Sequence, residues 1–326
     1  MFDKPANAKH VEEAADPAVG AAEFGRSARV SWFCMFCVVA AWIGNALYAL
    51  GEPGGFLKSY SPAIVASAMI GFVLSHGHHS GGWRSLLLFI GSVFLVGWAA
   101  ETVGIITGFP FGEYHYSEIM WPFIGHVPVS VLPAYCVMGY VSWSMARILL
   151  NRLDARMDWR FMVTAPIVAA LLMVIWDVSM DPLRATVEQR WIWLDGGLHY
   201  GIPLTNFAGW FGVTWAMFQL YALLLARFRP GRMAHAYQAD RGFWYAVPLM
   251  YLAFAVEYLA NPVVAGSIAG AVDVNGTQMG LAQLYAEIAV IACFTMLPAA
   301  LFTASRVRFA MREAHRRHRR YGGSGR

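Results

Sequence analysis

Long apolar runs dominate the chain, and short polar segments separate them. Each run is about 18–25 residues long, which is the length that a helix needs to cross the hydrocarbon core of a bilayer. The predicted spans are residues 31–50, 62–79, 84–107, 126–149, 160–180, 206–227, 242–260 and 280–304. The second is the weakest, because the stretch His76–His79 interrupts it. The pattern predicts an all-α, polytopic transmembrane helix bundle of about eight helices.

Composition agrees with a membrane protein. Hydrophobic residues make up 58% of the chain and charged residues only 13%, whereas soluble domains carry roughly 25% charged residues. Residues 1–28 are polar and lack the apolar core of a signal peptide, so we expect a mobile cytosolic tail there. We assign residues 29–305 to the transmembrane domain and residues 306–326 to a basic cytosolic tail.

The basic residues predict the orientation of the bundle. Of the 24 Lys and Arg residues, all but Lys58, Arg184 and Arg190 fall in the tails and in the loops on their side. Because positive loops face the cytosol, both termini are predicted there, in a multi-pass protein of the cytoplasmic (inner) membrane. The C-terminal run Arg316–Arg320 directly follows a span, so anionic membrane lipids are a nearer partner for it than nucleic acid. We expect no nucleic-acid binding.

Acidic residues recur at one depth of the predicted bundle. Ionisable groups inside a bilayer are costly and are functional candidates by default. With about 1.5 Å of rise per residue from the nearest cytosolic arginine, four helices each place an acid roughly 24–28 Å away. That depth is near the outer edge of a hydrocarbon core about 30 Å thick. The acids are Glu101, Asp177, Asp181, Glu257 and Glu287. They predict a polar cavity close to the outer face.

This acidic layer is suited to proton chemistry. Asp177 and Asp181 are four residues apart and share a helix face, and Pro182 ends the helix behind them. Carboxyls crowded together in a low dielectric cannot all ionise. A protonated carboxyl can donate a proton, and an ionised neighbour can orient or deprotonate water. For each single acid, the alternative is that it only hydrogen-bonds helices together.

The surroundings of the layer narrow the chemistry further. No basic side chain is predicted at this depth, which argues against a phosphate or diphosphate site. Aromatic rings offer faces that stabilise a carbocation. The candidates are Tyr114, Tyr116, Trp121, Trp176 and Trp210.

Two other motifs do not indicate a metal site. The stretch His76–His79 resembles one histidine box of a membrane di-iron oxygenase, but such enzymes need several boxes. Cys34 and Cys37 read C-x-x-C without a second ligand pair nearby, so we interpret them as small apolar residues of a helix. We expect no metal and no cofactor.

Three segments resemble the signatures of a known family. Gly108–Tyr116, with the sequence GFPFGEYHY after Glu101, is similar to the G-F-P-F-G-x-Y-x-Y signature of the integral-membrane carotenoid hydratases. Trp176–Pro182 (WDVSMDP) and Gly201–Trp210 (GIPLTNFAGW) resemble the second and third signatures. Together the three cover roughly residues 98–212.

The resemblance implies that water adds to the terminal C1–C2 double bond of an acyclic carotenoid by acid catalysis, giving a tertiary alcohol. The expected partners are this carotenoid, water and membrane lipids. The resemblance implies Glu101, Asp177 and Asp181 as the acid–base group, and the depth argument adds Glu257 and Glu287. The residues expected to line the substrate site are Phe109, Phe111, Tyr114, Tyr116, Trp176, Asn206 and Trp210.

Roles within the aspartate pair follow from their places on the helix. Asp181 lies at the helix end, where water can enter, and we predict that it orients water. Asp177 lies one turn deeper, against Trp176, and is the predicted proton donor. We expect Glu101 to be hydrogen-bonded to one of the two.

Two other classes of protein stay open. A membrane prenyltransferase would bind magnesium diphosphate at Asp177-x-x-x-Asp181, but it needs a second acidic motif and nearby basic residues. A carrier would use the buried carboxyls for proton coupling, but we find no internal repeat and no broken midplane helices.

Overall fold

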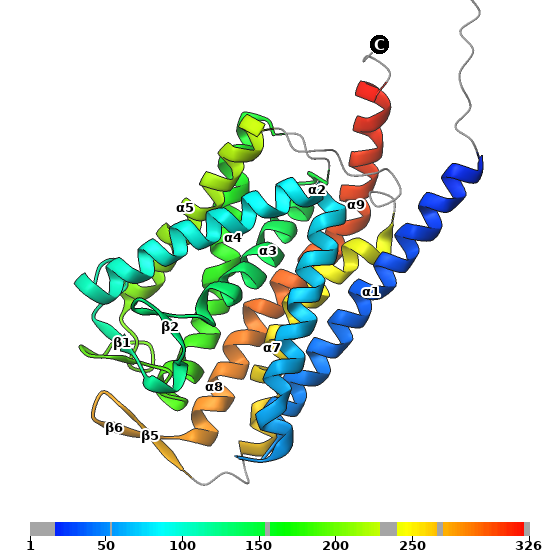
Figure 1. Ribbon diagram of the computed structural model, residues 1–326. Helices are drawn as coiled ribbons and strands as arrows, with labels where there is room; N and C mark the ends of the chain where they lie inside the picture. The colour runs from blue at the N-terminus through cyan, green and yellow to red at the C-terminus, as the bar shows by residue number, and fades with distance from the viewer. Residues whose placement is uncertain (1–16, 53, 154–156, 229–239, 266–269, 323–326) are drawn as a thin grey trace, which may run out of the picture.

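A computed structural model describes residues 17–52, 54–153, 157–228, 240–265 and 270–322 (Figure 1). Six of the helices in these residues are long and apolar enough to span a membrane. The described helices are α1 (Pro17–Leu50), α2 (Phe56–Thr107), α3 (Val131–Leu149), α4 (Trp159–Asp181), α5 (Leu204–Phe228), α7 (Arg241–Ala265), α8 (Leu281–Phe294) and α9 (Met296–Gly322). A short helix, η1 (Glu118–Met120), and a π-helical turn, η2 (Pro182–Val187), complete them. The predicted helical membrane bundle is confirmed.

The second and third predicted spans are two limbs of one bent helix, α2. Gly82 joins the limbs with φ 78° and ψ 166°, outside the helical region. Residues with a side chain adopt this combination of positive φ and extended ψ only at a cost of about 1–3 kcal/mol, whereas glycine adopts it freely. The limbs diverge from this bend (Figure 1). Counted as two limbs, and with α8 and α9 as one broken span, the described helices match the eight predicted spans.

Both ends of the chain are more helical than we predict. Helix α1 already begins at Pro17, inside the predicted tail, of which residues 1–16 lie outside the described part. Helix α9 continues to Gly322, through most of the predicted basic tail. Residues 323–326 of that tail also lie outside the described part.

The bundle has two distinct ends. Helix α1 begins and α9 finishes at one of them, which we name the terminal end (Figure 1). Three small two-stranded sheets lie at the other, the sheet end (Figure 1). Arg306 of α9 donates to the Asn151 side chain just after α3, at 3.1 Å, which fastens α9 beside that loop. Which compartment each end faces stays a prediction.

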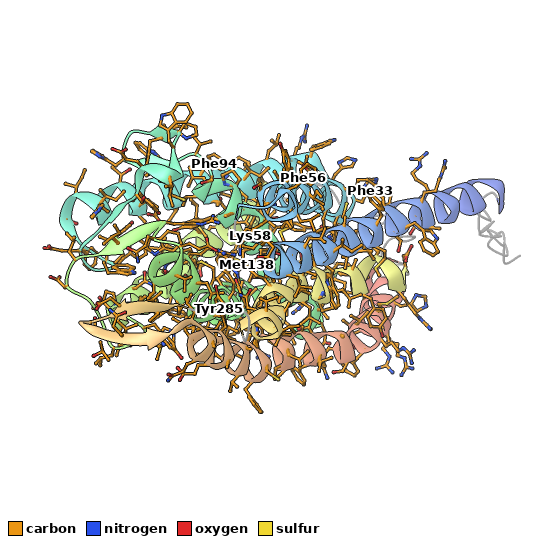
Figure 2. All side chains as sticks on the ribbon, turned by 90° about the horizontal axis from the view of Figure 1, so that it is seen from below. Phe33, Phe56, Lys58, Phe94, Met138 and Tyr285 are labelled. Atoms are coloured by element: carbon orange, nitrogen blue, oxygen red, sulfur yellow. The ribbon has the colours of Figure 1, made fainter. Side chains whose placement is uncertain are left out.

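Apolar side chains fill the bundle and also cover its outside. Met138 is fully buried at the centre, whereas Phe33 and Phe56 point outward with 46% and 73% of their surface exposed (Figure 2). A surface of this kind is what a helix bundle in lipid requires, because the bilayer core is itself apolar. Helix α1 packs along both α2 and α7, and α4 packs along α5.

Segments between the helices form antiparallel strand pairs at the sheet end, including residues 127–128, which belong to the predicted span 126–149. Strand β1 (Tyr114–Tyr116) pairs with β4 (Trp191–Trp193). Strands β2 (Phe123–Ile124) and β3 (Val127–Pro128) form a second pair, and β5 (Ala271–Val274) and β6 (Thr277–Gly280) form a third. Two hydrogen bonds connect the turn between β5 and β6 to Gly197. The Asn275 side chain donates to the Gly197 carbonyl at 2.7 Å and accepts from the Gly197 amide at 3.3 Å.

The interrupting histidine stretch lies inside a helix. His76 is buried, with Nδ1 2.6 Å from the Tyr140 hydroxyl and Nε2 3.1 Å from the Phe243 carbonyl. Its ring stacks on that of Phe243 with the centroids 3.8 Å apart. These contacts make His76 a hydrogen-bonded core residue. In the described part of the chain, no group of three or more His, Cys, Asp or Glu side chains is arranged to hold a metal.

Candidate active site

A cavity of about 400 Å³ lies between the helices at the sheet end. Four of the five predicted acids line it: Glu101, Asp177, Asp181 and Glu257. The structure thus brings together acids from three different helices, α2, α4 and α7. Six of the seven predicted substrate residues line it as well, namely Phe111, Tyr114, Tyr116, Trp176, Asn206 and Trp210.

Three tyrosine hydroxyls surround the Glu101 carboxyl. Tyr114 and Tyr116 donate to Oε2 at 2.6 and 2.8 Å, and Tyr135 of α3 donates to Oε1. Glu101 is only 3% exposed. The expected hydrogen bond between Glu101 and an aspartate is wrong, because both Glu101 oxygens accept hydrogen bonds from tyrosine hydroxyls instead.

The Y-x-Y spacing of the first signature follows from strand geometry. Successive side chains of a strand point to opposite faces, so Tyr114 and Tyr116 share the face toward the cavity. Their partners in the register are Trp193 and Trp191, which also line the cavity. Burial raises the pKa of both tyrosines, and the Glu101 carboxylate beside them raises it further, so they remain hydrogen-bond donors. His115 points away and is exposed.

The bend before β1 is closely packed. Gly108 ends α2 in the left-handed region, with φ 75°. A Cβ on Gly209 of α5 would lie 2.8 Å from the Pro110 carbonyl oxygen, so glycine is needed for α5 to approach this bend. Phe111 is buried between α2 and α5. Phe109 is 74% exposed and does not line the cavity.

One amide joins the two aspartates. Asn206, at the start of α5, donates through Nδ2 to Asp181 Oδ2 at 2.7 Å and to Asp177 Oδ2 at 3.2 Å. The indole of Trp191 donates to the other oxygen of Asp181 at 2.7 Å. Oδ1 of Asp177 is buried and has no hydrogen-bond partner among the described residues. Asp177 is therefore the member of the pair that keeps an oxygen available for a further partner.

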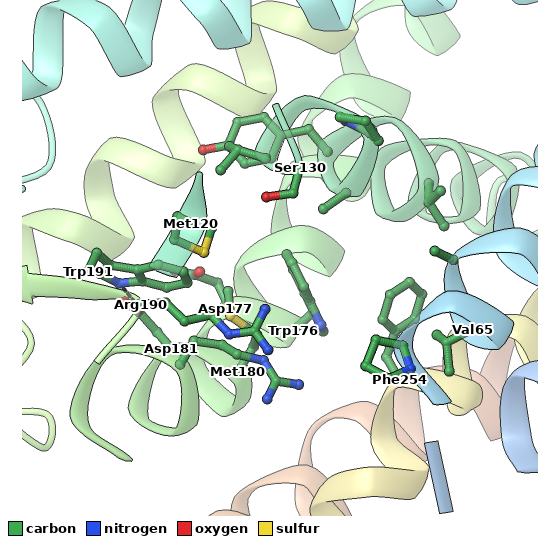
Figure 3. A pocket seen from close by; sticks show the side chains of 18 of the residues that line it. Val65, Met120, Ser130, Trp176, Asp177, Met180, Asp181, Arg190, Trp191 and Phe254 are labelled. Atoms are coloured by element: carbon green, nitrogen blue, oxygen red, sulfur yellow. Dashed lines mark hydrogen bonds between the residues drawn. The ribbon is translucent and has the colours of Figure 1, made fainter. Parts of the chain in front are cut away.

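Aromatic rings form much of the remaining wall. The ring centroids of Trp210 and Tyr135 are 4.6 Å apart, and Trp176 lies edge-on to Trp210 at 6.3 Å. Trp176 stands between the acidic part of the cavity and an apolar part that contains Val65 and Phe254 (Figure 3). The cavity therefore has an acidic side and an apolar side.

Arg184 and Arg190 also line the cavity, which corrects the expectation that no basic side chain lies near the acids. Arg184, on the π-helical turn η2, pairs with Glu257 and Glu188. Arg190 donates to Glu188 at 2.6 Å, and the Tyr48 hydroxyl donates to the same carboxylate at 2.9 Å. The chain after Asp181 continues as a helical turn, and this turn carries Arg184 back against the bundle.

Glu287 does not join the other acids. It is partly exposed on α8, where it accepts from Tyr200 at 2.8 Å and from Gln283 at 2.8 Å. Leu284 and Ile288 form the buried face of that helix, and Glu287 lies beside that face rather than on it. The depth argument counts residues along a helix and says nothing about the direction of a side chain around it.

Sequence reasoning missed several lining residues. Tyr135 lies alone in an apolar helix, and nothing in its neighbours marks it. Trp191 and Trp193 carry a usable signal, because W-I-W alternates in the same way as the Y-H-Y of β1. Two alternating aromatic triplets in loops at the same end of a bundle are candidates for a strand pair.

A protein family and a relative of known name match parts of this chain. No solved structure matches the chain. A stretch of 117 residues is 29% identical to a protein named bisanhydrobacterioruberin hydratase from Haloarcula japonica. The match covers 36% of this chain and 38% of that relative. A family profile described as carotenoid biosynthesis protein matches residues 61–274, which include Glu101, both aspartates and Asn206. The chain belongs to the carotenoid biosynthesis protein family.

Proposed function

We propose that this protein is a carotenoid hydratase, which adds water to the terminal C1–C2 double bond of an acyclic carotenoid. The proposal rests on the buried pair Asp177 and Asp181, which both accept hydrogen bonds from the Asn206 amide. Asp177 Oδ1 has no hydrogen-bond partner among the described residues, and it lies beside a cavity with aromatic walls. Membership of the carotenoid biosynthesis family and the partial likeness to a hydratase support the same substrate class.

The hydrogen bonds divide the acids into different roles. An ionised carboxylate only accepts hydrogen bonds, and Glu101 is the acceptor for three hydroxyls. We assign it the part of a fixed negative charge. Asp181 receives donors on both oxygens, and it serves as the base that orients water. Asp177 is the acid, because its unpartnered oxygen can carry a proton toward the substrate.

In the proposed reaction, Asp177 transfers its proton to C2 of the alkene, and the electron pair of the double bond forms the new C–H bond. A tertiary cation remains at C1. The ring faces of Trp176 and Trp210, together with the negative charge of Glu101, stabilise this cation. Water then bonds to C1, Asp181 takes its proton, and return of that proton to Asp177 restores the site. The net change is the addition of one water.

The direct test is expression in a host that accumulates an acyclic carotenoid, followed by mass analysis of the pigments. We expect pigments heavier by one water for each end group that reacts. Asp177→Asn keeps the shape and the Asn206 contact but removes the acidic proton, so hydration should fall by roughly 10²–10⁴-fold. Protein level in the membrane fraction is the control. Full activity in a folded Asp177→Asn protein would remove Asp177 from the chemistry.

A prenyltransferase is the second candidate, and the two arginines in the cavity are the observation that favours it. Phosphates bind to guanidinium groups. Here, however, Arg184 and Arg190 are already paired with Glu257 and Glu188. A gain of one prenyl unit in the same pigment assay would support this candidate and contradict the hydratase.

A further inference from the structure

We infer that the carotenoid enters the cavity sideways from the lipid, through an opening between the first limb of α2 and the start of α3. Only its end group then lies inside, and the rest of the polyene stays in this opening and in the lipid beyond. This inference rests on the proposed function for the identity of the ligand. Its geometry rests on exposed residues that also line the cavity.

Two helical stripes form the sides of the opening. On α2, Pro62, Ala66 and Ile70 are spaced four residues apart, so they lie on one face, and all three are exposed while they line the cavity. On α3, Ser130 at the N-cap and Ala134 are likewise four apart, exposed and cavity-lining. A residue that is both exposed and cavity-lining marks a place where the cavity reaches the surface.

The bend in α2 explains why the opening exists. The second limb packs on α3, where a Cβ at Gly97 would lie 3.1 Å from the Tyr135 ring. The first limb packs on α1 instead, where a Cβ at Gly44 would lie 2.6 Å from the Val65 side chain. Because the limbs diverge from Gly82, the first limb leaves α3 toward the sheet end (Figure 1).

The chemistry of the opening fits a hydrocarbon. Its sides are Pro, Ala and Ile, and the Ser130 hydroxyl is the polar side chain among the five. Arg190 and the two aspartates lie on the other side of Trp176 from Val65 (Figure 3). A substrate dissolved in the bilayer meets the apolar side first and reaches the acids with its leading end.

The size of the cavity sets how much of the substrate it holds. If a carbon group fills roughly the 30 Å³ of a water molecule, then about 400 Å³ holds on the order of a dozen such groups. An acyclic carotenoid has several times as many carbons. The cavity therefore holds the reacting end and its first double bonds, and the remaining chain must leave through an apolar opening.

Narrowing the opening tests the inference. Ala66→Phe fills one side of it, and Ala63→Phe is the matched control, because Ala63 is exposed on the same helix but does not line the cavity. We expect Ala66→Phe to lower the rate of carotenoid hydration by about tenfold or more, because the added ring occupies space that the polyene needs. Ala63→Phe should stay near the wild-type rate. Where the wild-type protein hydrates the carotenoid, equal rates in both variants would overturn the inference.

A second measurement separates this inference from the proposed reaction. In an Asp177→Asn background, the amount of carotenoid that co-purifies with the protein reports binding without turnover. Ala66→Phe should reduce the bound pigment relative to Ala63→Phe. If pigment binding falls as expected but wild-type protein hydrates nothing, the opening stands and the hydratase proposal fails. If hydration is found but bound pigment is the same in both variants, the opening is wrong and the function stands.

Discussion

Trp191, on strand β4, donates its indole N–H to the Asp181 carboxylate at 2.7 Å. The helical turn η2 separates the two residues along the chain. This hydrogen bond joins Asp181 to the β1–β4 sheet, which covers the cavity. Register places Trp191 opposite Tyr116, whose hydroxyl holds Glu101. One strand pair therefore positions a donor on each of two acidic groups, which makes the β1–β4 sheet part of the site rather than a cover alone.

The first prediction removes that donor. Trp191→Phe keeps an aromatic ring but loses the hydrogen bond to Asp181, and a hydrogen bond to a charged group contributes about 1.5–3 kcal/mol. If that stabilisation holds Asp181 in place for water, carotenoid hydration should fall by roughly tenfold or more. The rate is measured by pigment analysis at matched protein levels.

Trp193→Phe is the comparison for this prediction. Trp193 lies on the same face of β4, but its indole nitrogen has no hydrogen-bond partner among the described residues. The same ring change there removes no hydrogen bond, so the loss of activity should be smaller. A greater loss in Trp193→Phe would mean that ring packing matters more than the Asp181 contact.

The second prediction contrasts two glutamates at one depth. Glu101→Gln removes a buried negative charge beside the proposed cation, and hydration should fall by roughly 10²–10³-fold, as when a group that stabilises the transition state is lost. Glu287→Gln should retain most activity, because Glu287 lies outside the cavity on α8. Both variants are assayed in the same host. Loss of activity in Glu287→Gln with a normal protein level would contradict this placement.

These two glutamates also show how far the sequence predicts the site. Counting residues along helices predicts one level for Glu101, Asp177 and Glu257, because the rise per residue is nearly constant, and these three acids line one cavity. Counting says nothing about which way a helix is turned, so Glu287 is wrongly included. The turn of α8 is set by packing of Leu284 and Ile288, which a single helix sequence does not reveal with confidence in so apolar a chain.

Contacts between distant segments were the least predictable part. Tyr135 and Trp191 reach their carboxyls only because α3 and β4 come beside α2 and α4 in the folded chain. The charge pattern predicts Arg184 in an outer loop, yet η2 continues the helix and turns the Arg184 guanidinium toward Glu257. The helices themselves were predictable, because long apolar runs have few other solutions in a bilayer.

The third prediction concerns this buried ion pair. Arg184 and Glu257 are 15% and 5% exposed, and Arg184→Met leaves the Glu257 carboxylate buried without its ion-pair partner. Arg184→Met should lower the free energy of unfolding by about 3–5 kcal/mol, whereas the double variant Arg184→Met/Glu257→Met should recover most of that loss. Unfolding in mixed detergent micelles is measured for wild type, for Arg184→Met, for Glu257→Met and for the double variant. Additive losses in the double variant would show that the two side chains do not act as a pair.

The last prediction concerns how the stability contributed by Glu188, which pairs with Arg184 and Arg190, depends on pH. Burial raises the pKa of Glu188, but the charges of Arg184 and Arg190, together with the hydrogen bonds from Tyr48 and Arg190, outweigh it and hold that pKa below its usual range. A carboxyl whose folded pKa is lowered stabilises the protein fully above the unfolded value of about 4.3, and this contribution disappears as the pH falls through the folded value. Glu188→Gln should therefore have a lower Tm than wild type at neutral pH.

The difference in Tm between wild type and Glu188→Gln is the quantity to follow as the pH is lowered. It should stay constant down to the ordinary pKa of a glutamate and shrink only below it, since the two arginines keep Glu188 ionised in the folded protein. Subtracting the two proteins cancels the other acids, which titrate in both. A difference that already shrinks well above that pH would mean that the arginines do not hold the Glu188 charge.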